Sequence, residues 1–477
     1  MSVAYHHGIE TVEDLSGPRP VRTVKSAVIG IVGTAPAGTF NEPVRLYSEQ
    51  DAAQFGPDLP GFTIPQALKR WAEGGAGTVI VINVLDPETH VDAVADEDVT
   101  FNAVTGRAKL AHGAISDLVL TDGADVTYVL NTDYEILDAL KGEIRALPGG
   151  AIALGSTKVA DYNHLDPSQV LAADIIGEID IDGNRSGIEA FRLCQTLFKF
   201  KPKILIAPGY SSQNSVRAAL DTMAQKLRGV ALADAPAGTT VTQAIAGRGA
   251  AGAINFNTNS GRTVLLYPHI KAFDPSTGGE RLEPYSQHFA SVICRTDLAR
   301  GFWKSPSNEP IPSALGLEFP ITGSPNEVDS EANALNEVGI TTIMNEDGIL
   351  TWGNRTAAWP SETHPINFLS VRRTADMIEE SIELAQRQFV DEPGSPAMIT
   401  TVQETVAAYL RLLVQRGAIL DGRVWWDPAE NPPEQLALGN YTWCYDFMPP
   451  TPMERITNKA RINMGYLAQL SEQMASA

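Results

Sequence analysis

One acidic segment of the sequence has the residue types and spacing of a calcium-binding loop. It carries carboxylates at alternate positions, then a glycine, and finally a glutamate at the twelfth position: Glu178, Asp180, Asp182, Gly183 and Glu189. Oxygen ligands in this order are typical of an EF-hand. Two features disfavour calcium, because the first position holds Glu where the shorter Asp is usual, and Arg185 brings a positive charge close to the cation. The alternative is a solvated acidic turn that caps a helix from Ile188 to Phe198.

Two glycine-rich segments have the spacing of phosphate-binding loops but lack the surroundings that such loops need. The segment from Gly247 to Gly252 satisfies G-x-G-x-x-G, yet it follows an expected helix that begins near Thr239 or Thr240. A dinucleotide-binding turn would instead follow a strand and open a helix. Gly33 to Gly38 does follow an expected strand, but Thr39 and Phe40 stand where a phosphate loop needs Lys and then Ser or Thr. Both segments therefore favour ordinary loops.

Metal-binding and nucleophilic residues do not form a recognisable set. His6 and His7 could join His112 or His164 at a metal, but no spacing fixes such a geometry. The three cysteines are far apart, at Cys194, Cys294 and Cys444. They indicate neither a disulfide framework nor a zinc site, and buried thiols in a reducing cytoplasm are the preferred interpretation. Since no G-x-S-x-G elbow is present either, we predict no catalytic residue, no metal and no cofactor.

Charge and hydropathy narrow the classes of partner. The 477 residues carry a formal net charge of −21, which repels a phosphate backbone, so we expect no direct binding of nucleic acid. The chain is long enough for roughly two to four domains. Its start has no basic and apolar run of the kind found in signal peptides. Its longest nearly apolar stretch, Ser26 to Gly38, is too short to span a bilayer, so we expect no membrane insertion.

The elements that would position functional residues are clearest in the last third of the chain, from Asn336 to Met464. A helix is predicted between Ser370 and Pro393 from apolar residues spaced three or four apart. These residues are Val371, Ala375, Ile378, Ile382, Ala385 and Phe389. One face of this helix should be buried.

A second helix is predicted from the capping box of Thr401 and Glu404 to Gly417. Its apolar side carries Val402, Val406, Tyr409 and Leu413, and its other side carries Gln403, Arg411 and Gln415. From Arg455 to Met464 the apolar period changes to two, which indicates a strand with one apolar and one cationic face. Residues 1–15 also alternate and are separated from the rest by a segment rich in Pro and Gly, which indicates a strand on a tether.

The remainder of the chain alternates between strands and helices, with one interruption. Near the start we expect a strand at Ala27 to Val32, a helix at Ile64 to Trp71 and a strand at Thr78 to Leu85, and we expect these to pack with the C-terminal block. The stretch from about Val94 to Leu154 consists of short β segments and turns. An α/β pattern then returns, with a strand at Ile204 to Ala207, a helix at Gln213 to Leu227 and a strand at Val230 to Ala233.

Several separated segments of the C-terminal block match one protein family in order. They read LNEVGITTIMNEDGILTWGNRT, SVRRTADMIEESI, GAILDGRVWWDP and PPTPMERI. In these segments the chain resembles the C-terminal part of the tail sheath proteins of contractile phage tails and related injection machines. The resemblance extends upstream through KPKILIAPGYSSQNSVRAALDTMAQKLRGVALADAP and RTDLARGFWKSPSNEPI to AVIGIVGTAPAGTFNEPVRLYS. Only about residues 90–160 match loosely.

This resemblance and the patterns together imply a multidomain α/β fold of mixed α+β content. We expect an inner α/β domain built from both chain ends, a middle α/β domain and a small β-rich insertion that faces outward. The expected boundaries are 1–20 for an N-terminal arm and linker, 21–93 and 341–452 for the inner domain, 94–154 for the insertion, 155–340 for the middle domain and 453–477 for a C-terminal arm.

The function that the resemblance implies is structural and not enzymatic. Such a subunit polymerises as stacked hexameric rings around a tail tube and contracts to drive the tube through a cell envelope. Its partners would be further copies, the tail tube protein, and the baseplate and tail terminator proteins. It would assemble in the bacterial host cytoplasm and reside in the virion. A calcium- or ligand-binding module at Glu178 to Glu189 is the alternative, and a Rossmann-like nucleotide enzyme is third.

The resemblance also suggests which residues would meet neighbours. In the family the N-terminal arm pairs with adjacent subunits. We therefore expect the two arm strands to join one sheet between copies, through Val3, Tyr5, His7, Ile9, Arg455, Ile456, Lys459, Ala460, Arg461, Ile462 and Met464. The alternative for the cationic strand is an edge protected by Lys and Arg. A helix of the inner domain meets the acidic tube in the family, and Arg411 and Arg416 are the matching residues, with ordinary solvated arginines as the alternative.

Overall fold

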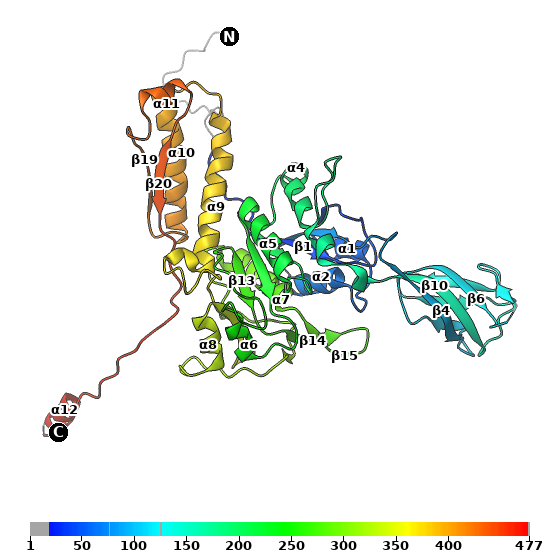
Figure 1. Ribbon diagram of the computed structural model, residues 1–477. Coiled ribbons are helices and arrows are strands. Elements are labelled where there is room, and N and C mark those ends of the chain that lie inside the picture. Colours follow the sequence, from blue (N-terminus) through cyan, green and yellow to red (C-terminus); the bar gives the residue numbers. More distant parts are fainter. Residues whose placement is uncertain (1–18, 76, 125, 476–477) are drawn as a thin grey trace, which may run out of the picture.

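The structure, a computed structural model, describes residues 19–75, 77–124 and 126–475. An α/β body lies at the centre, a β-rich unit extends to one side, a pair of long helices rises from the body, and a thin arm ends in a short helix (Figure 1). The predicted N-terminal strand, with Val3, Tyr5, His7 and Ile9, lies outside the described residues. Mixed α/β architecture with several sheets is therefore confirmed.

The body is built on an eight-stranded sheet with the order β18-β17-β13-β12-β11-β1-β3-β2. Its strands are β1 (Val28–Gly33), β2 (Val44–Leu46), β3 (Thr78–Asn83), β11 (Ile204–Ile206), β12 (Val230–Asp234), β13 (Thr263–Leu266), β17 (Ile340–Asn345) and β18 (Ile349–Trp352). The six strands from β17 to β3 are parallel, and the edge strands β18 and β2 are antiparallel to their neighbours. Such a sheet needs helices on both faces.

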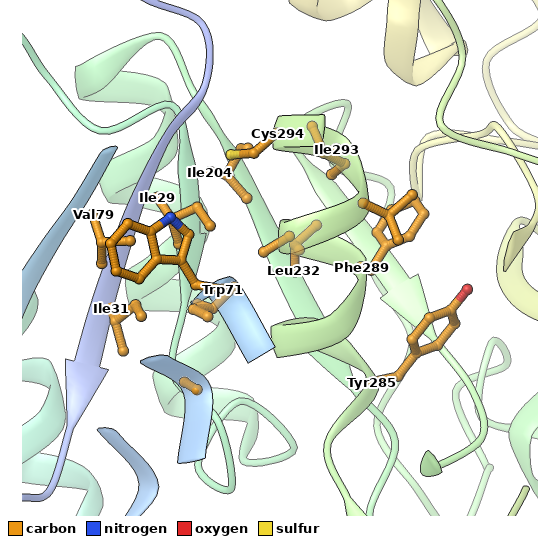
Figure 2. Close-up of a cluster of buried hydrophobic side chains, with 14 of the residues drawn as sticks. Ile29, Ile31, Trp71, Val79, Ile204, Leu232, Tyr285, Phe289, Ile293 and Cys294 are labelled. Carbon is orange, nitrogen blue, oxygen red and sulfur yellow. The ribbon is translucent and has the colours of Figure 1, made fainter. Parts of the chain in front are cut away.

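Alternate residues of these strands serve two separate cores. On one face, α2 (Thr63–Gly74) and α7 (Tyr285–Arg300) cover the sheet, and Figure 2 shows Trp71 of α2 beside Ile29 and Val79. On the other face, α5 (Asn214–Leu227) packs against the next residues along the strands, including Val28 and Ile80. Continuous apolar runs such as VIGIV and TVIVIN are therefore explained by burial on both faces.

The sheet joins segments that we expected in separate domains. β1 pairs with β11 through Ile29 and Ile204, and β17 pairs with β13 through Ile340 and Leu265. The predicted strands near the start therefore pair directly with the middle of the chain. Their predicted packing with the C-terminal block is also seen, because β17 and β18 belong to the same sheet and Ile343 and Leu369 share a core with Ile29. Sequence patterns identify each strand but not its neighbours, because parallel strands pair across long connections.

The β-rich insertion forms a unit with its own core. Its strands are β4 (Val91–Thr100), β5 (Arg107–Lys109), β6 (Ile115–Thr121), β7 (Thr127–Tyr128), β8 (Tyr134–Asp138), β9 (Glu143–Ala146) and β10 (Thr157–Leu165). They form a four-stranded sheet, β4-β10-β6-β7, and a three-stranded sheet, β5-β9-β8. The β-rich character is as predicted, but the strands begin before residue 94 and continue past residue 154. Phe101, Leu120 and Tyr134 are at the centre of its core.

The C-terminal unit consists of α9 (Leu369–Gln386), α10 (Pro396–Gln415), β19 (Gly422–Trp426), α11 (Pro433–Ala437) and β20 (Trp443–Phe447). Val402, Val406, Tyr409 and Leu413 of α10 are buried as predicted, against Ile378 and Ile382 of α9. Of the predicted α9 stripe, Val371 and Ala375 are also buried, whereas Ala385 and Phe389 are partly exposed.

The structure extends one prediction about these helices and contradicts another. The apolar stripe of α9 is buried as predicted in Val371, Ala375, Ile378 and Ile382, and the first half of the helix is in addition buried on nearly all other sides where it enters the body. α10 begins at Pro396 and not at Thr401, and Ser395 caps it by accepting a 3.2 Å hydrogen bond from the Met398 amide. Thr401 lies inside the helix and donates to the Ala397 carbonyl. The predicted end is correct, because Gly417 has a φ of +73° just after the helix.

The C-terminal arm has no strand within this chain. Residues 453–463 are exposed and irregular, and α12 (Gly465–Ala475) follows. A strand requires a hydrogen-bonded partner, and the prediction for Arg455 to Met464 depended on a neighbouring copy. It therefore stays a prediction about the assembled protein, whereas α12 is an element that the sequence analysis did not predict.

The remaining elements are short. They are α1 (Glu49–Ala52), α3 (Ala172–Ile176), α4 (Cys194–Phe198), α6 (Val241–Ala246), α8 (Glu331–Glu337), β14 (Ile270–Asp274), β15 (Gly279–Glu283) and β16 (Gly316–Leu317), with 3-10 helices at Ala53–Phe55, Pro167–Gln169, Gly187–Leu193, Pro365–Asn367 and Arg387–Phe389. In the part of the chain that the structure describes, no helix combines the length and apolar character needed to cross a bilayer.

Candidate functional site

The place where a doubly wound sheet usually binds a ligand is filled by this chain itself. The chain runs from β1 to β3 on one side and later to β11 on the other, so the ends of β1 and β11 form the switch point. There the fully buried Thr34 accepts a 3.2 Å hydrogen bond from the Thr63 amide through Oγ1 and a 2.9 Å bond from the Ile64 amide through its carbonyl. These amides begin α2 and would otherwise face a phosphate. The side chain and carbonyl of Thr34, directly after Gly33, therefore accept the hydrogen bonds that a bound phosphate would accept in a phosphate-binding loop.

The second glycine-rich segment is held by its own arginine. It follows α6, as expected, and Arg248 donates hydrogen bonds of 2.6–2.8 Å to five carbonyl oxygens. They belong to Val338, Phe256, Thr258, Ala357 and Trp359. Burial lowers the pKa of Arg248, because its guanidinium has exchanged water for these carbonyls. Gly247 to Gly252 therefore ties α6 to the segment around Trp359, and its donors are directed inward.

The carboxylates of the acidic loop do not converge. Asp180 accepts hydrogen bonds from the Asp182 amide at 2.9 Å and from the amide and side chain of Asn184, each at 2.8 Å. The Asn184 side chain contributes most to holding the pKa of Asp180 below its usual value. Glu189 is directed to Lys226 at 3.1 Å. Within the described residues, no group of three or more His, Cys, Asp or Glu could hold a metal ion. The geometry is that of a solvated turn, but the expected helix from Ile188 to Phe198 is a 3-10 helix, Gly187–Leu193, followed by the short α4, and no side chain of the turn caps it.

Two of the histidines considered for a metal site instead stack on each other. The rings of His112 and His164 lie 3.9 Å apart at 11°, at the base of the insertion. His164 is buried and its Nδ1 lies 3.1 Å from the Leu165 carbonyl. His6 and His7 lie outside the described residues. The pair also lies beside Tyr162, so these contacts are all within the insertion.

Buried charges gather where α9 enters the body. Arg373 contacts Asp297 through two hydrogen bonds of 2.8 and 2.6 Å, and both side chains are almost fully buried. Arg262 contacts Asp376 in the same bidentate way, at 2.7 and 2.8 Å. Lys203 pairs with Glu380, and burial lowers the pKa of Lys203. These pairs fix α9 to α7 and to the segments that lead into β11 and β13, and the paired side chains are mostly buried.

A second buried charge cluster surrounds Glu283. Arg70 donates two hydrogen bonds to its carboxylate, at 2.7 and 2.8 Å, and Arg281 donates one at 2.8 Å. His288 Nε2 lies 3.0 Å from the same carboxylate, and its Nδ1 lies 3.0 Å from Ser313 Oγ. Burial opposes ionisation of Glu283, but bonds from His288 and Arg70 outweigh it and keep the pKa of Glu283 well below its usual value. Burial lowers the pKa of His288. A neutral imidazole that donates to Glu283 and accepts from Ser313 fits both contacts.

The surfaces that remain open lie at the C-terminal unit and the arms. β19 and β20 pair only with each other among the described residues, so both outer edges of this ribbon lack a strand partner. The C-terminal arm is anchored at Glu454, which accepts a 3.0 Å hydrogen bond from Arg355, and beyond it Ile456, Ile462 and Met464 are at least 70% exposed. Unpaired edges and exposed apolar side chains are features of an association surface.

The start of the described chain lies on the same unit. The Arg19 amide donates to Gln388 at 2.8 Å, and the Val24 amide donates to Ser381 Oγ at 3.0 Å. The segment therefore runs along α9, and the Tyr409 hydroxyl of α10 lies 3.2 Å from Thr23 Oγ1. The described chain thus begins on the α9–α10 unit, and the C-terminal arm leaves the same unit after β20.

Comparison with known proteins decides the family. The model of the phage tail sheath central domain matches residues 183–357, that of the phage tail sheath C-terminal domain matches residues 361–463, and a family of unknown function matches residues 87–174. The tail sheath protein of Burkholderia phage BcepMu is 48% identical over 98% of this chain and 99% of its own length. The chain belongs to the phage tail sheath family. The tail sheath protein of Escherichia phage P2 is 26% identical over 98% of both chains.

Solved sheath structures share the fold of this sheath protein. The sheath complex of the PVC extracellular contractile injection system, in its contracted state, has a TM-score of 0.60 and 16% identity and covers 98% of this chain and 100% of its own. The contracted helical sheath of the anti-feeding prophage has a TM-score of 0.57 and 18% identity and covers 97% and 100%. The resemblance in the sequence is therefore confirmed, and this protein is a structural component of a contractile tail.

The candidate tube-contact residues lie on the outside of α10. Arg411 and Arg416 are both exposed, and Arg411 makes a 3.4 Å contact with Glu404 in which both side chains are more than 60% exposed. The assignment of these arginines to the tube stays a prediction.

The β19–β20 ribbon of this sheath protein was missed in the sequence. Its signal was nevertheless present, because GRVWW and TWCYDF are short runs of aromatic and β-branched residues. The segment between them contains Pro and Gly, which usually bound strands.

Proposed function

We propose that this sheath protein polymerises as stacked hexameric rings around a tail tube and contracts to drive the tube through a cell envelope, for delivery of a genome or an effector. Family membership over nearly the whole chain carries this proposal. Its partners are further copies, the tail tube protein, and the baseplate and tail terminator proteins. It assembles in the bacterial host cytoplasm before it becomes part of the virion tail.

Contraction needs no nucleotide in this proposal. A polymer built in a metastable state releases free energy when its subunits pass to an arrangement with larger contacts. The closed switch point supports this, since the first amides of α2 already bind Thr34 and are not free to cradle a phosphate. A subunit that contracts without hydrolysing a nucleotide is consistent with this closed switch point.

Strand exchange between copies keeps the subunits connected while they move. The N-terminal segment Val3 to Ile9 of one copy and the segment Arg455 to Met464 of another join the two outer edges of the β19–β20 ribbon of a third. Both edges lack a strand partner among the described residues, and the C-terminal segment is exposed in an extended stretch. Each backbone hydrogen bond adds about 0.5–1.5 kcal/mol, and a strand makes several. The linkers at Pro18 to Pro20 and Pro449 to Pro452 allow displacement.

Deletion of residues 1–15 tests this proposal. The shortened chain should keep the thermal unfolding temperature of the intact chain, because residues 19–475 contain the packed cores. Electron microscopy should then show isolated particles or single rings where the intact chain forms long striated tubes. Tubes of normal length and yield from the shortened chain would contradict strand exchange.

The tube contact is tested separately by charge reversal on α10. We propose that Arg411 and Arg416 contact an acidic tube surface, because both are exposed on the outer side of α10. Replacing both with Glu should lower co-assembly with the tube by at least about tenfold, which corresponds to about 1.4 kcal/mol. Replacing Arg107 and Lys109, which are exposed on β5 of the insertion, is the matched control. Equal co-assembly of both variants would remove Arg411 and Arg416 from the interface.

A further inference from the structure

Helix α12 carries an apolar face that nothing in the described chain covers. Its large apolar side chains are all more than half exposed: Tyr466, Leu467, Leu470 and Met474. Spacings of three and four place them on one side of the helix. The helix has only 11 residues, and isolated helices of this length are marginal in water. It therefore needs a partner that covers this face.

Residues 19–463, as far as the structure describes them, are not that partner. The arm leaves the body at Glu454 and runs exposed and irregular to Asn463, so α12 lies well apart from the body (Figure 1). At about 3.3 Å per residue, the arm between Glu454 and Gly465 can extend roughly 36 Å. This length carries the helix beyond its own subunit. In a polymer of identical subunits, every arm reaches the same surface of the next subunit. The partner of α12 is therefore a second copy of this chain.

A groove of fitting shape lies on the C-terminal unit. It has a volume of about 450 Å³ and lies between the segment Pro20–Val21 and helix α10. Its floor on α10 is formed by small residues at spacings of four and three, Thr401, Thr405 and Ala408, with Leu412 at one end. Such a row forms a trough in a helix surface into which the side chains of a second helix can pack. Tyr409 and Val21 add apolar surface.

The charges at the groove fit the approach of the arm. Glu404 stands at the groove and is exposed, and its contact with Arg411 is long, at 3.4 Å. The segment just before α12 carries Arg455, Lys459 and Arg461, all exposed. A cationic segment followed by an apolar helix face therefore meets a groove with an acidic residue and a floor of small side chains. A second groove nearby is less suited, because three arginines line it: Arg19, Arg22 and Arg387.

We propose that α12 of one copy docks its Tyr466, Leu467, Leu470 and Met474 face into the groove between Pro20–Val21 and α10 of a neighbouring copy. The partner is a second copy of this chain, and the mode is a helix in a groove. This inference rests on the proposed sheath assembly and adds a contact that strand exchange alone does not include. The arm then holds its neighbour at two points, a strand and a terminal helix.

Disulfide cross-linking in assembled tubes tests the contact. Met474→Cys is combined with Ala408→Cys in a chain where the partly exposed Cys444 is replaced by Ser; Cys194 and Cys294 are buried and stay. Mild oxidation should yield a ladder of dimers and higher multimers on a non-reducing gel. The matched control combines Met474→Cys with Leu384→Cys, a position in the second groove, and should give at least tenfold less product.

The outcomes separate this inference from the proposed function. Tubes without a ladder, or a ladder that is as strong through Leu384→Cys, would overturn the docking of α12 and leave sheath assembly intact. Absence of tubes from the unsubstituted chain would instead contradict the proposed function.

A second pair of variants works without cysteines. The double variant Leu467→Gln with Leu470→Gln should reduce the yield of long tubes at least tenfold. The double variant Leu467→Met with Leu470→Met keeps the face apolar and should form long tubes in normal yield. Tubes of normal yield from the glutamine variant would also overturn the docking.

Discussion

The first half of α9 and the C-terminal arm are opposites in the same chain. α9 enters the body with nearly every side chain buried, including Arg373 and Asp376, which are held in bidentate ion pairs. The arm from Met453 to Asn463 has every side chain exposed and carries Arg455, Lys459 and Arg461 without an ion pair to any described residue. Both regions contain cationic side chains, but these side chains have different roles. Those on α9 hold the subunit together, and those on the arm remain available to a neighbour.

α9 also explains how the subunit behaves as one piece. Its first half belongs to the α/β body through Asp297, Arg262 and Lys203, and its second half packs against α10 through Ile378 and Ile382. One continuous helix shared by two cores prevents them from moving independently. Displacement between subunits must therefore occur in the arms.

Breaking a buried ion pair of α9 should have the largest effect on stability. Arg373→Met leaves the Asp297 carboxylate buried without its cation, and such a loss costs about 3–5 kcal/mol. Urea unfolding of the unassembled chain measures it. Arg411→Met, which breaks an exposed pair, is the control and should cost less than about 0.5 kcal/mol. Similar losses in both variants would contradict the contrast between buried and exposed charges.

Opening a cavity between α9 and α10 should have the next largest effect. Ile378 is fully buried in the core of the C-terminal unit, and Ile378→Ala should destabilise the chain by about 2–4 kcal/mol. The same measurement on Ile462→Ala provides the comparison, because Ile462 is 97% exposed on the arm and should change stability by less than about 0.5 kcal/mol. A loss at Ile462 as large as that at Ile378 would show that the arm is packed in the free subunit.

Acidification should destabilise the body through His288. Burial depresses the pKa of His288 in the folded chain, so below about pH 6.5 the unfolded chain binds a proton that the folded chain does not. The contribution of His288 to the free energy of unfolding is fully present above that pH. It decreases as the pH falls, by at most about 1.4 kcal/mol per pH unit. Thermal unfolding between pH 7.5 and 5.5 should show a smaller decrease for His288→Gln than for the intact chain. Parallel pH profiles would mean that His288 does not carry the effect.

Removing the arm should have the smallest effect on the free subunit. Among the described residues, deletion of residues 453–477 breaks one ion pair, between Arg355 and Glu454, in which Glu454 is exposed. The free energy of unfolding should change by less than about 1 kcal/mol. Tube formation, observed by electron microscopy, should nevertheless be lost. A shortened chain that is strongly destabilised would place the arm among the structural elements of the subunit.

The same contrast explains what the sequence could predict. The strand before Gly33, α2 and the α9 stripe follow from local patterns, because burial imposes its period on the sequence. The start of α10 was misplaced because Thr401 and Glu404 imitate a capping box, whereas the true signal is Ser395 followed by Pro396 at the first helical position. The placement of β1 beside β11 depends on contacts between distant segments, which no local pattern contains.

The functional residues were harder to predict than the fold. Arg411 and Arg416 are predicted from their match to the tube-facing helix of the resembled family; both are exposed in the structure, and their contact with the tube stays a prediction. The segment Arg455 to Met464 has the alternation of a strand, yet a strand needs a second chain that a single sequence does not specify. Sequence patterns alone do not single out the face of α12, because Tyr466, Leu467, Leu470 and Met474 follow directly after the alternating segment from Arg455 to Met464.

The way in which the insertion joins the body makes it an exchangeable cassette. Its two ends lie side by side, since the Asp166 amide donates a 3.0 Å hydrogen bond to the His90 carbonyl where the chain enters and leaves. It has its own core, and a separate family model matches residues 87–174. A module whose ends lie roughly 5 Å apart could be spliced between these two points if it also replaced Ala114 and Leu140, which pack into the core on one face of the large sheet. A repeating polymer of such subunits would be a display scaffold, with one grafted module on every copy.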